Sequence, residues 1–109
     1  MPTATERFVE LAARIAHRLG SPRVRALHLP PASGTKEAEF CALELDDGSI
    51  GFAYIQLDAT ESPLRERHGA RSLSGIDAAS LAAGFATGDP VARALGFATI
   101  NALSQGLFA

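Results

Sequence analysis

The side chains best suited to chemistry lie close together in one polar segment, residues 65–75. Arginine and histidine side chains can converge on an anion, and the free N–H groups at the start of a following helix attract negative charge. The candidate anion-binding residues are Arg67, His68, Arg71, Ser74 and Gly75. A simpler interpretation is a solvated loop whose arginines pair with Glu61 and Glu66, because charged loop residues usually lie in water. The sequence favours this simpler interpretation and keeps anion binding as a hypothesis.

Metal-binding side chains are few and widely spaced. The thiol and imidazole donors are Cys41, His17, His28 and His68. None is spaced from another as C-x-x-C or H-x-x-x-H, the patterns that bring two ligands together locally. Cys41 follows Phe40 in an apolar run and is typical of a small core residue. The sequence therefore predicts no metal site within one chain.

Motifs for catalysis are also absent from the sequence. It has no nucleophile elbow, phosphate-binding loop, dinucleotide glycine pattern or paired-carboxylate arrangement, so we predict no catalytic residue and no cofactor. Ten basic residues, with one lysine among them, are balanced by twelve acidic residues, which argues against a nucleic-acid surface. No apolar run is long enough for a membrane span. A single cysteine excludes an internal disulfide, so we expect a reducing, cytoplasmic location.

The elements that must position these side chains follow from periodicity and turn signals. The 109 residues are predicted to form one domain, 1–109. Helical spacing of apolar residues follows a capping box at residues 3–6 and ends at Gly20. Strands are expected over residues 23–29, 39–45 and 50–57, with an Asp47-Gly48 hairpin turn between the last two. A long polar loop, 58–75, precedes helices over 76–84 and 90–109. This order, αβββαα, predicts a two-layer α+β domain in which helices pack on a three-stranded antiparallel meander.

The alternation along the second and third strands is apolar on both faces. One face carries Cys41, Leu43 and Leu45, then Ala53, Ile55 and Leu57, and we expect it to meet the helices. The opposite face carries Phe40 and Ala42, then Ile50, Phe52 and Tyr54. A sheet with one solvated face would alternate apolar with polar residues. The opposite face is therefore expected to lie under a loop or against another subunit or domain.

The last helix is apolar nearly all round. Asp89 and Pro90 give it a capping carboxylate and a proline at the first helical position. Arg93 is its one charged residue, so several sides need cover, and in so short a chain that cover is expected partly from outside. Asn101 lies on its least apolar stripe. We predict that its amide binds backbone groups, most simply those of the loop 58–75.

Three segments resemble a known family. They are residues 47–54, residues 73–81 and above all residues 89–103, where Leu95-Gly-Phe-Ala-Thr-Ile-Asn-Ala-Leu103 fits the pattern L-G-x-A-x-I-N-A-L. Over most of its length the chain resembles the N-terminal domain of the putative heavy-metal chelation family. The resemblance implies a fold like the N-terminal domain of enolase. It also implies a Rossmann-like second domain with a site between the two, and that domain is missing from this sequence.

Three functional hypotheses follow, of which the third is a small-ligand or metal binder that works as a homodimer. The first is a non-catalytic binding or assembly module that works as a homodimer, since surplus apolar surface is the strongest signal and closed dimers are the commonest assembly. The second is a subunit that completes a ligand- or metal-binding site, which could be enzymatic, with a separately encoded Rossmann-like partner. The expected interface residues are Phe40, Phe52, Tyr54, Phe97, Asn101, Leu107 and Phe108.

Overall fold

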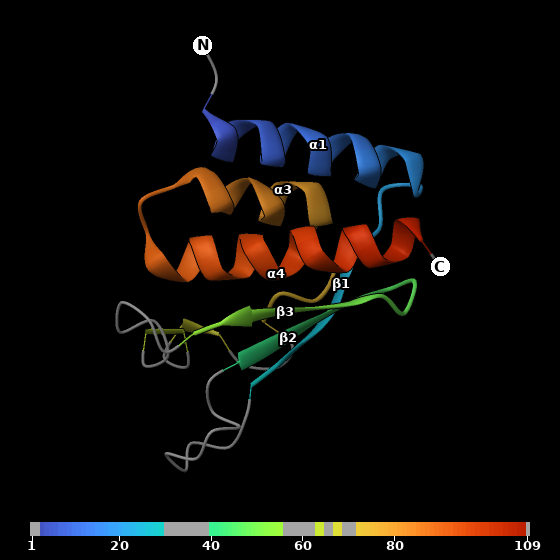
Figure 1. The fold of residues 1–109 in the computed structure, drawn as a ribbon. Coiled ribbons are helices and arrows are strands. Elements are labelled where there is room, and N and C mark those ends of the chain that lie inside the picture. Colours follow the sequence, from blue (N-terminus) through green and yellow to red (C-terminus); the bar gives the residue numbers. More distant parts are fainter. Residues whose placement is uncertain (1–2, 30–39, 56–62, 65–66, 69–71, 109) are drawn as a thin grey trace.

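A computed structural model describes residues 3–29, 40–55, 63–64, 67–68 and 72–108. Three strands form one sheet, and the helices lie together on one side of it (Figure 1). This arrangement confirms the α+β class and the order αβββαα predicted from the sequence. The elements are α1 (Ala4–Arg18), β1 (Val24–His28), β2 (Phe40–Leu45), β3 (Ile50–Tyr54), α3 (Ala78–Ala82), the 3₁₀ helix η3 (Ala83–Ala86) and α4 (Pro90–Leu107).

The sheet is an antiparallel meander in the order β1-β2-β3. Its second turn is the predicted Asp47-Gly48 hairpin turn, but it is not the two-residue type in which both residues take a positive φ, because only Gly48 does so, at 91°. The Gly48 N–H donates to the Leu45 carbonyl at 3.0 Å, and the Leu45 N–H donates to the Ser49 carbonyl at 2.9 Å. A type I turn followed by a left-handed glycine gives this pattern, and it sets the register of β2 and β3.

Local signals fix the ends of α1 as expected. The Thr3 hydroxyl accepts the Glu6 N–H at 3.1 Å, which confirms the N-cap half of the capping box, and the Glu6 carboxylate accepts the Thr3 hydroxyl at 3.2 Å. At the other end Gly20 takes a φ of 85°, and the Ser21 N–H donates to the Ala16 carbonyl at 2.8 Å. The left-handed glycine lets the chain leave the helix and turn toward β1.

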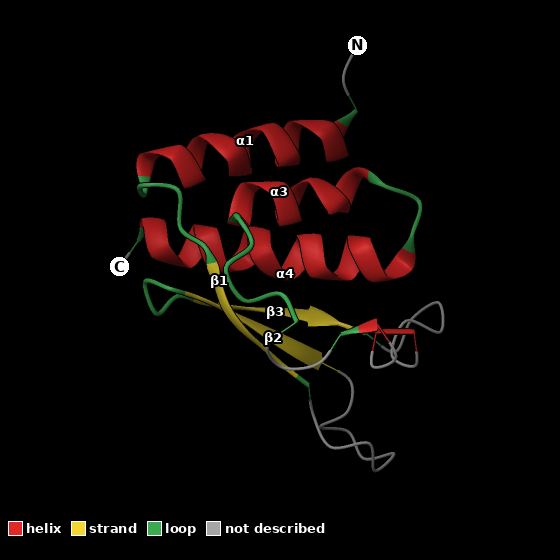
Figure 2. Cartoon of the chain, turned by 180° about the vertical axis from the view of Figure 1, so that it is seen from behind, coloured by secondary structure: helices red, strands yellow, loops and turns green. Residues whose placement is uncertain are grey.

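Helix α4 lies between the sheet and α1, with α3 beside it (Figures 1 and 2). Several sides of α4 are therefore buried inside the chain. The buried residues are Val91, Leu95, Gly96, Ala98, Thr99, Ala102 and Leu103. Most of the cover that the sequence analysis expected from outside comes from the sheet and the other helices. That expectation was wrong for the middle of α4, and for the parts of α4 that stay exposed it remains a prediction.

One hydrophobic core joins these layers. It contains Cys41, Leu43, Leu45, Ala53 and Ile55 on the inner face of the sheet, as predicted; Leu57 lies outside the described residues. Alanines supply most of the helical side: Ala12 and Ala16 of α1, Ala78 and Ala82 of α3, Ala98 and Ala102 of α4. Small side chains let the helices approach one another closely. None of the helices in the described part of the chain is long and apolar enough to cross a membrane.

Candidate functional site

Helix α4 binds the free edge of the sheet through two amide side chains. Strand β3 is an edge strand, so its outward backbone groups have no strand partner. The Asn101 Nδ2 donates to the Phe52 carbonyl at 2.8 Å, and the Gln105 Oε1 accepts the Ile50 N–H at 2.7 Å. The expected backbone bond of Asn101 is present, but its described partner is β3 rather than the loop 58–75.

Gly51 explains why α4 can lie so close to β3. A Cβ at this position would overlap the Ala98 carbonyl oxygen and the Ala102 backbone nitrogen. Both are main-chain atoms of α4, so they cannot rotate away as a side chain could. The sequence pattern around residues 47–54 contains this glycine, but only the packing of α4 shows why a side chain is excluded.

The outer face of the sheet, which we define by Phe40, Ile50, Phe52 and Tyr54, carries exposed apolar side chains. Phe52 is 58% exposed, and the Phe40 and Tyr54 rings meet edge to face with centroids 5.4 Å apart. No described helix or strand packs against this face (Figures 1 and 2). These three aromatics are interface residues expected from the sequence, and the structure leaves them accessible to a partner.

A charged cluster borders the outer face on β1 and β2. Glu44 accepts the Arg25 Nη1 at 2.9 Å through one oxygen and lies 3.0 Å from the His28 Nε2 through the other. The Arg25 Nη2 also donates to the Asp46 carbonyl at 2.6 Å. The His28 hydrogen bond, followed by the bond and charge of Arg25, lowers the pKa of Glu44. The charges of this face are therefore paired within the chain.

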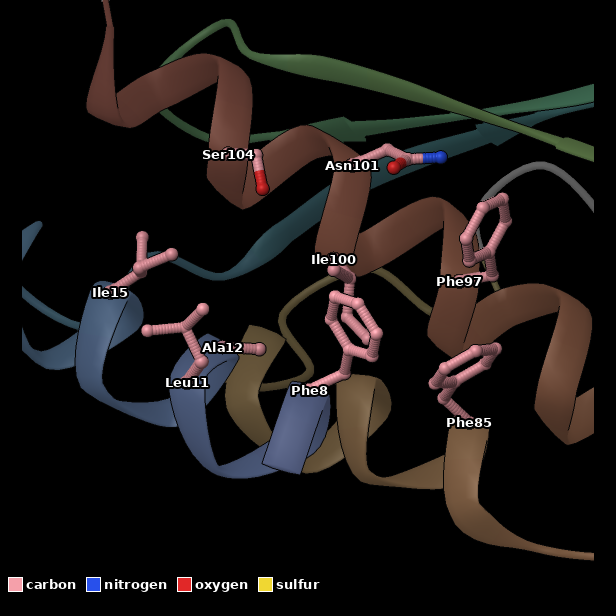
Figure 3. A pocket seen from close by; sticks show the side chains of 9 residues that line it. All are labelled: Phe8, Leu11, Ala12, Ile15, Phe85, Phe97, Ile100, Asn101 and Ser104. Atoms are coloured by element: carbon pink, nitrogen blue, oxygen red, sulfur yellow. The ribbon is translucent and has the colours of Figure 1, made fainter. Parts of the chain in front are cut away.

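A second apolar surface, the α1–α4 groove, lies between α1, α4 and η3 (Figure 3). Its pocket measures about 180 Å³ and is lined by Phe8, Leu11, Ala12, Ile15, Phe85, Phe97, Ile100, Asn101 and Ser104. The Phe85 ring lies between those of Phe8 and Phe97, at centroid distances of 6.4 and 5.5 Å. In Figure 3 the Phe8 side chain points from α1 toward Ile100, and the Ser104 hydroxyl points toward α1.

The groove shows which apolar residues of α1 stay exposed. Phe8 and Leu11 belong to the apolar residues that recur at helical spacing in the first helix, yet they are 53% and 52% exposed. Ala12 and Ala16 face the core instead. Helical periodicity locates an apolar side, but it cannot tell which part of a wide apolar side is covered. Of the interface residues expected on the last helix, Phe97 lines this groove, while Leu107 and Phe108 are exposed at the end of α4.

The predicted anion-binding residues are brought together only in part. The Arg67 Nη1 forms an ion pair with the Asp89 Oδ2 at 2.9 Å, and Asp89 also caps α4 by accepting the Ala92 N–H. The His68 Nδ1 lies 3.3 Å from the Ser72 Oγ. Partial burial, followed by the charge of Arg67, lowers the pKa of His68 below its ordinary value of 6.5. Arg71 lies outside the described residues.

The start of α3 is occupied by a carboxylate. Asp77 caps this five-residue helix by accepting the Ser80 N–H at 3.0 Å. Before it, the Gly75 N–H donates to the Val24 carbonyl, and the Gly75 carbonyl accepts the Nη1 of the Arg23 guanidinium, each at 2.8 Å. The backbone of Gly75 therefore bonds within the chain. Anion binding by Arg67, His68, Arg71, Ser74 and Gly75 remains a prediction.

The thiol and imidazole donors do not form a chelate. Cys41 is buried on the inner face of the sheet, and this burial raises the pKa of its thiol to about 11. His28 lies on β1 with its imidazole paired to Glu44 on the outer side. Among the described residues, no three His, Cys, Asp or Glu side chains group closely enough to hold a metal ion. Heavy metals prefer thiolate and imidazole ligands, so the described donor set does not fit such an ion.

Comparison with known proteins places the chain in a family. No curated protein and no solved structure matches it. The model of one protein family, described as "Putative heavy-metal chelation", matches residues 38–104. That match spans β2, β3 and most of α4, and so includes Gly51 and Asn101 at the contact between helix and sheet edge. The chain belongs to the putative heavy-metal chelation family, as its resemblance to that family indicated.

Proposed function

We propose that the chain is a non-catalytic assembly module of this family and that it works as a homodimer. The observation that carries the proposal is that aromatic side chains are exposed on two surfaces: Phe52 on the outer face is 58% exposed, and Phe8 and Phe97 in the α1–α4 groove are 53% and 43% exposed. Single exposed apolar residues are common, but grouped ones on this scale usually mark an interaction site. A dimer with two-fold symmetry would remove such a surface from water on both copies at once.

Sedimentation at micromolar concentration tests this proposal. We expect a species of twice the 11.4 kDa chain mass, which dissociates on dilution. Substitution of Gly88→Ala, at a position where a Cβ would meet open space, serves as a matched control that should leave the mass unchanged. A single species of 11.4 kDa at every concentration tested would contradict the proposal.

A second candidate follows from the family description and the donor chemistry. The family is described by metal chelation, yet the described donors of this chain do not form a chelate. A metal site would then need ligands from elsewhere, for example from a separately encoded Rossmann-like partner docked on the outer face. Zinc and cadmium titrations of the chain alone test this candidate. We expect no stoichiometric binding that depends on Cys41 or His28, and such binding by the chain alone would contradict it.

A further inference from the structure

Strand β3 has the composition of a strand that pairs readily with another chain. Its five residues, Ile50–Tyr54, include no charge and no proline, which are the residues that most often keep an exposed edge strand from pairing. Its register with β2 is continuous from residue 50 to residue 54, so no bulge turns the edge away. Isoleucine, phenylalanine and tyrosine also favour extended backbone. Without other protection, this edge would accept another strand.

The backbone of β3 offers its outward groups at every second residue. Along an antiparallel pair, residues whose N–H and C=O groups point toward the partner strand alternate with residues whose groups point away. The Ile50 N–H and the Phe52 carbonyl bind side chains of α4 rather than β2, so residues 50, 52 and 54 are the outward set. This set is symmetric about Phe52. A second copy of β3 could therefore pair with it antiparallel, with Phe52 opposite its own counterpart and Ile50 opposite Tyr54 of the partner subunit.

Two amide side chains occupy part of this outward set. Asn101 binds the Phe52 carbonyl at 2.8 Å and Gln105 binds the Ile50 N–H at 2.7 Å, and an added strand would need both of these backbone groups. Both amides project from α4, which lies so close to Gly51 of β3 that a Cβ there would overlap the helix backbone. Helix α4 is thereby fixed beside the strand (Figures 1 and 2), and its amides stay within reach of the edge.

We propose that Asn101 and Gln105 close the β3 edge against strand addition, and that the strand they exclude is β3 of a second copy. The opposite edge of the sheet is also occupied where β1 begins. There the Val24 N–H donates to the Ile76 carbonyl, and the Val24 carbonyl accepts the Gly75 N–H, each at 2.8 Å. The inference does not depend on the proposed homodimer. It states that a partner meets the sheet on a face rather than by extending it at β3.

Removal of both amides tests the proposal. The double variant Asn101→Ala with Gln105→Ala keeps α4 helical, because alanine favours helix, but frees the Ile50 N–H and the Phe52 carbonyl. Val91→Ala is the control, because it trims a buried side chain at the start of α4 and leaves both amides in place. In sedimentation, the double variant should associate beyond the wild-type state at concentrations about tenfold lower than Val91→Ala does, because no hydrogen bond to α4 has to break first. Circular dichroism checks that each variant folds.

Two lysine substitutions, each added to the double variant, locate the contact. Phe52→Lys places two like charges directly opposite each other in the symmetric strand pair, so it should reverse the added association. Phe40→Lys places the same charge on the outer face, but on the central strand β2, and should leave the added association in place.

The outcomes separate this inference from the proposed function. If the double variant associates no more readily than Val91→Ala, the two amides do not close the edge and the inference is wrong. Equal reversal by Phe52→Lys and Phe40→Lys would also overturn it, because the added association would then run through the outer face. A monomeric wild type would overturn the proposed homodimer and leave the closed edge standing.

Discussion

The two faces of the sheet have similar apolar character in sequence but opposite surroundings in the fold. On the inner face, Leu43 and Ala53 are buried under α4, and Gly51 lies against the α4 backbone. On the outer face, Phe40, Phe52 and Tyr54 lie on the same strands and are exposed. Residues one position apart therefore serve different purposes: the inner set holds the fold, and the outer set remains free for contact with another molecule.

The largest effect is expected at the contact between α4 and β3. Gly51→Ala adds a methyl group where main-chain atoms of Ala98 and Ala102 already lie, so helix and strand must separate. We expect a loss of more than about 4 kcal/mol in the free energy of unfolding, or a chain that no longer folds. Urea denaturation measures this loss, with Gly88→Ala as the control at an open position. Equal stability of the two variants would show that α4 does not pack on Gly51.

A smaller loss is expected from opening a cavity in the inner face. Leu43 is fully buried, so Leu43→Ala should cost about 2–5 kcal/mol in urea denaturation. Phe52→Ala, on the outer face of the neighbouring strand, should change stability by no more than about 0.5 kcal/mol at concentrations where the chain is monomeric. If Leu43→Ala and Phe52→Ala lower the free energy of unfolding equally, the outer face is covered within the chain, and the two faces do not differ in burial.

Asn101 joins α4 to the edge of β3, and its loss should have an intermediate effect. Asn101→Leu leaves the Phe52 carbonyl without its described donor at an exposed contact and should cost about 0.5–1.5 kcal/mol. Thermal unfolding measures the change. Ser104→Ala, one turn further along α4, removes a hydroxyl for which the structure describes no bond and is the matched control. A melting temperature of Asn101→Leu at or above the wild-type value would assign Asn101 to a binding surface instead.

The smallest effect should come from the charged cluster beside the outer face. The bond from His28, and then Arg25, holds the pKa of Glu44 below its ordinary value of 4.5, so ionised Glu44 stabilises the folded chain above that pH. This stabilisation is lost as the pH falls from about 4.5 through the lower pKa that Glu44 has in the folded chain. Glu44→Gln should therefore unfold slightly more easily than wild type at neutral pH and equally easily in acid. High salt should reduce the difference in stability between Glu44→Gln and the wild type. A stability difference that grows in acid would contradict the stabilising role of ionised Glu44.

Local sequence signals predicted the elements and their order correctly. Thr3 with Glu6, Gly20, and Asp89 with Pro90 each satisfy backbone groups within a few residues, so their effects do not depend on the rest of the chain. Alternation likewise identified the buried side of β2 and β3. Such signals act over one turn or one hairpin, and the structure confirms them.

Only the tertiary structure decided which apolar residues are covered. Phe8 and Leu11 have the periodicity of core residues, yet the alanines of α1 face the core and leave them outside. Helix α4 looked too apolar to be covered by so short a chain, yet the sheet and α1 enclose it. The described partner of Asn101 is Phe52 of β3, 49 residues away in sequence, rather than the loop 58–75 that the sequence favoured. These outcomes depend on contacts between segments distant in sequence, and no local periodicity contains them.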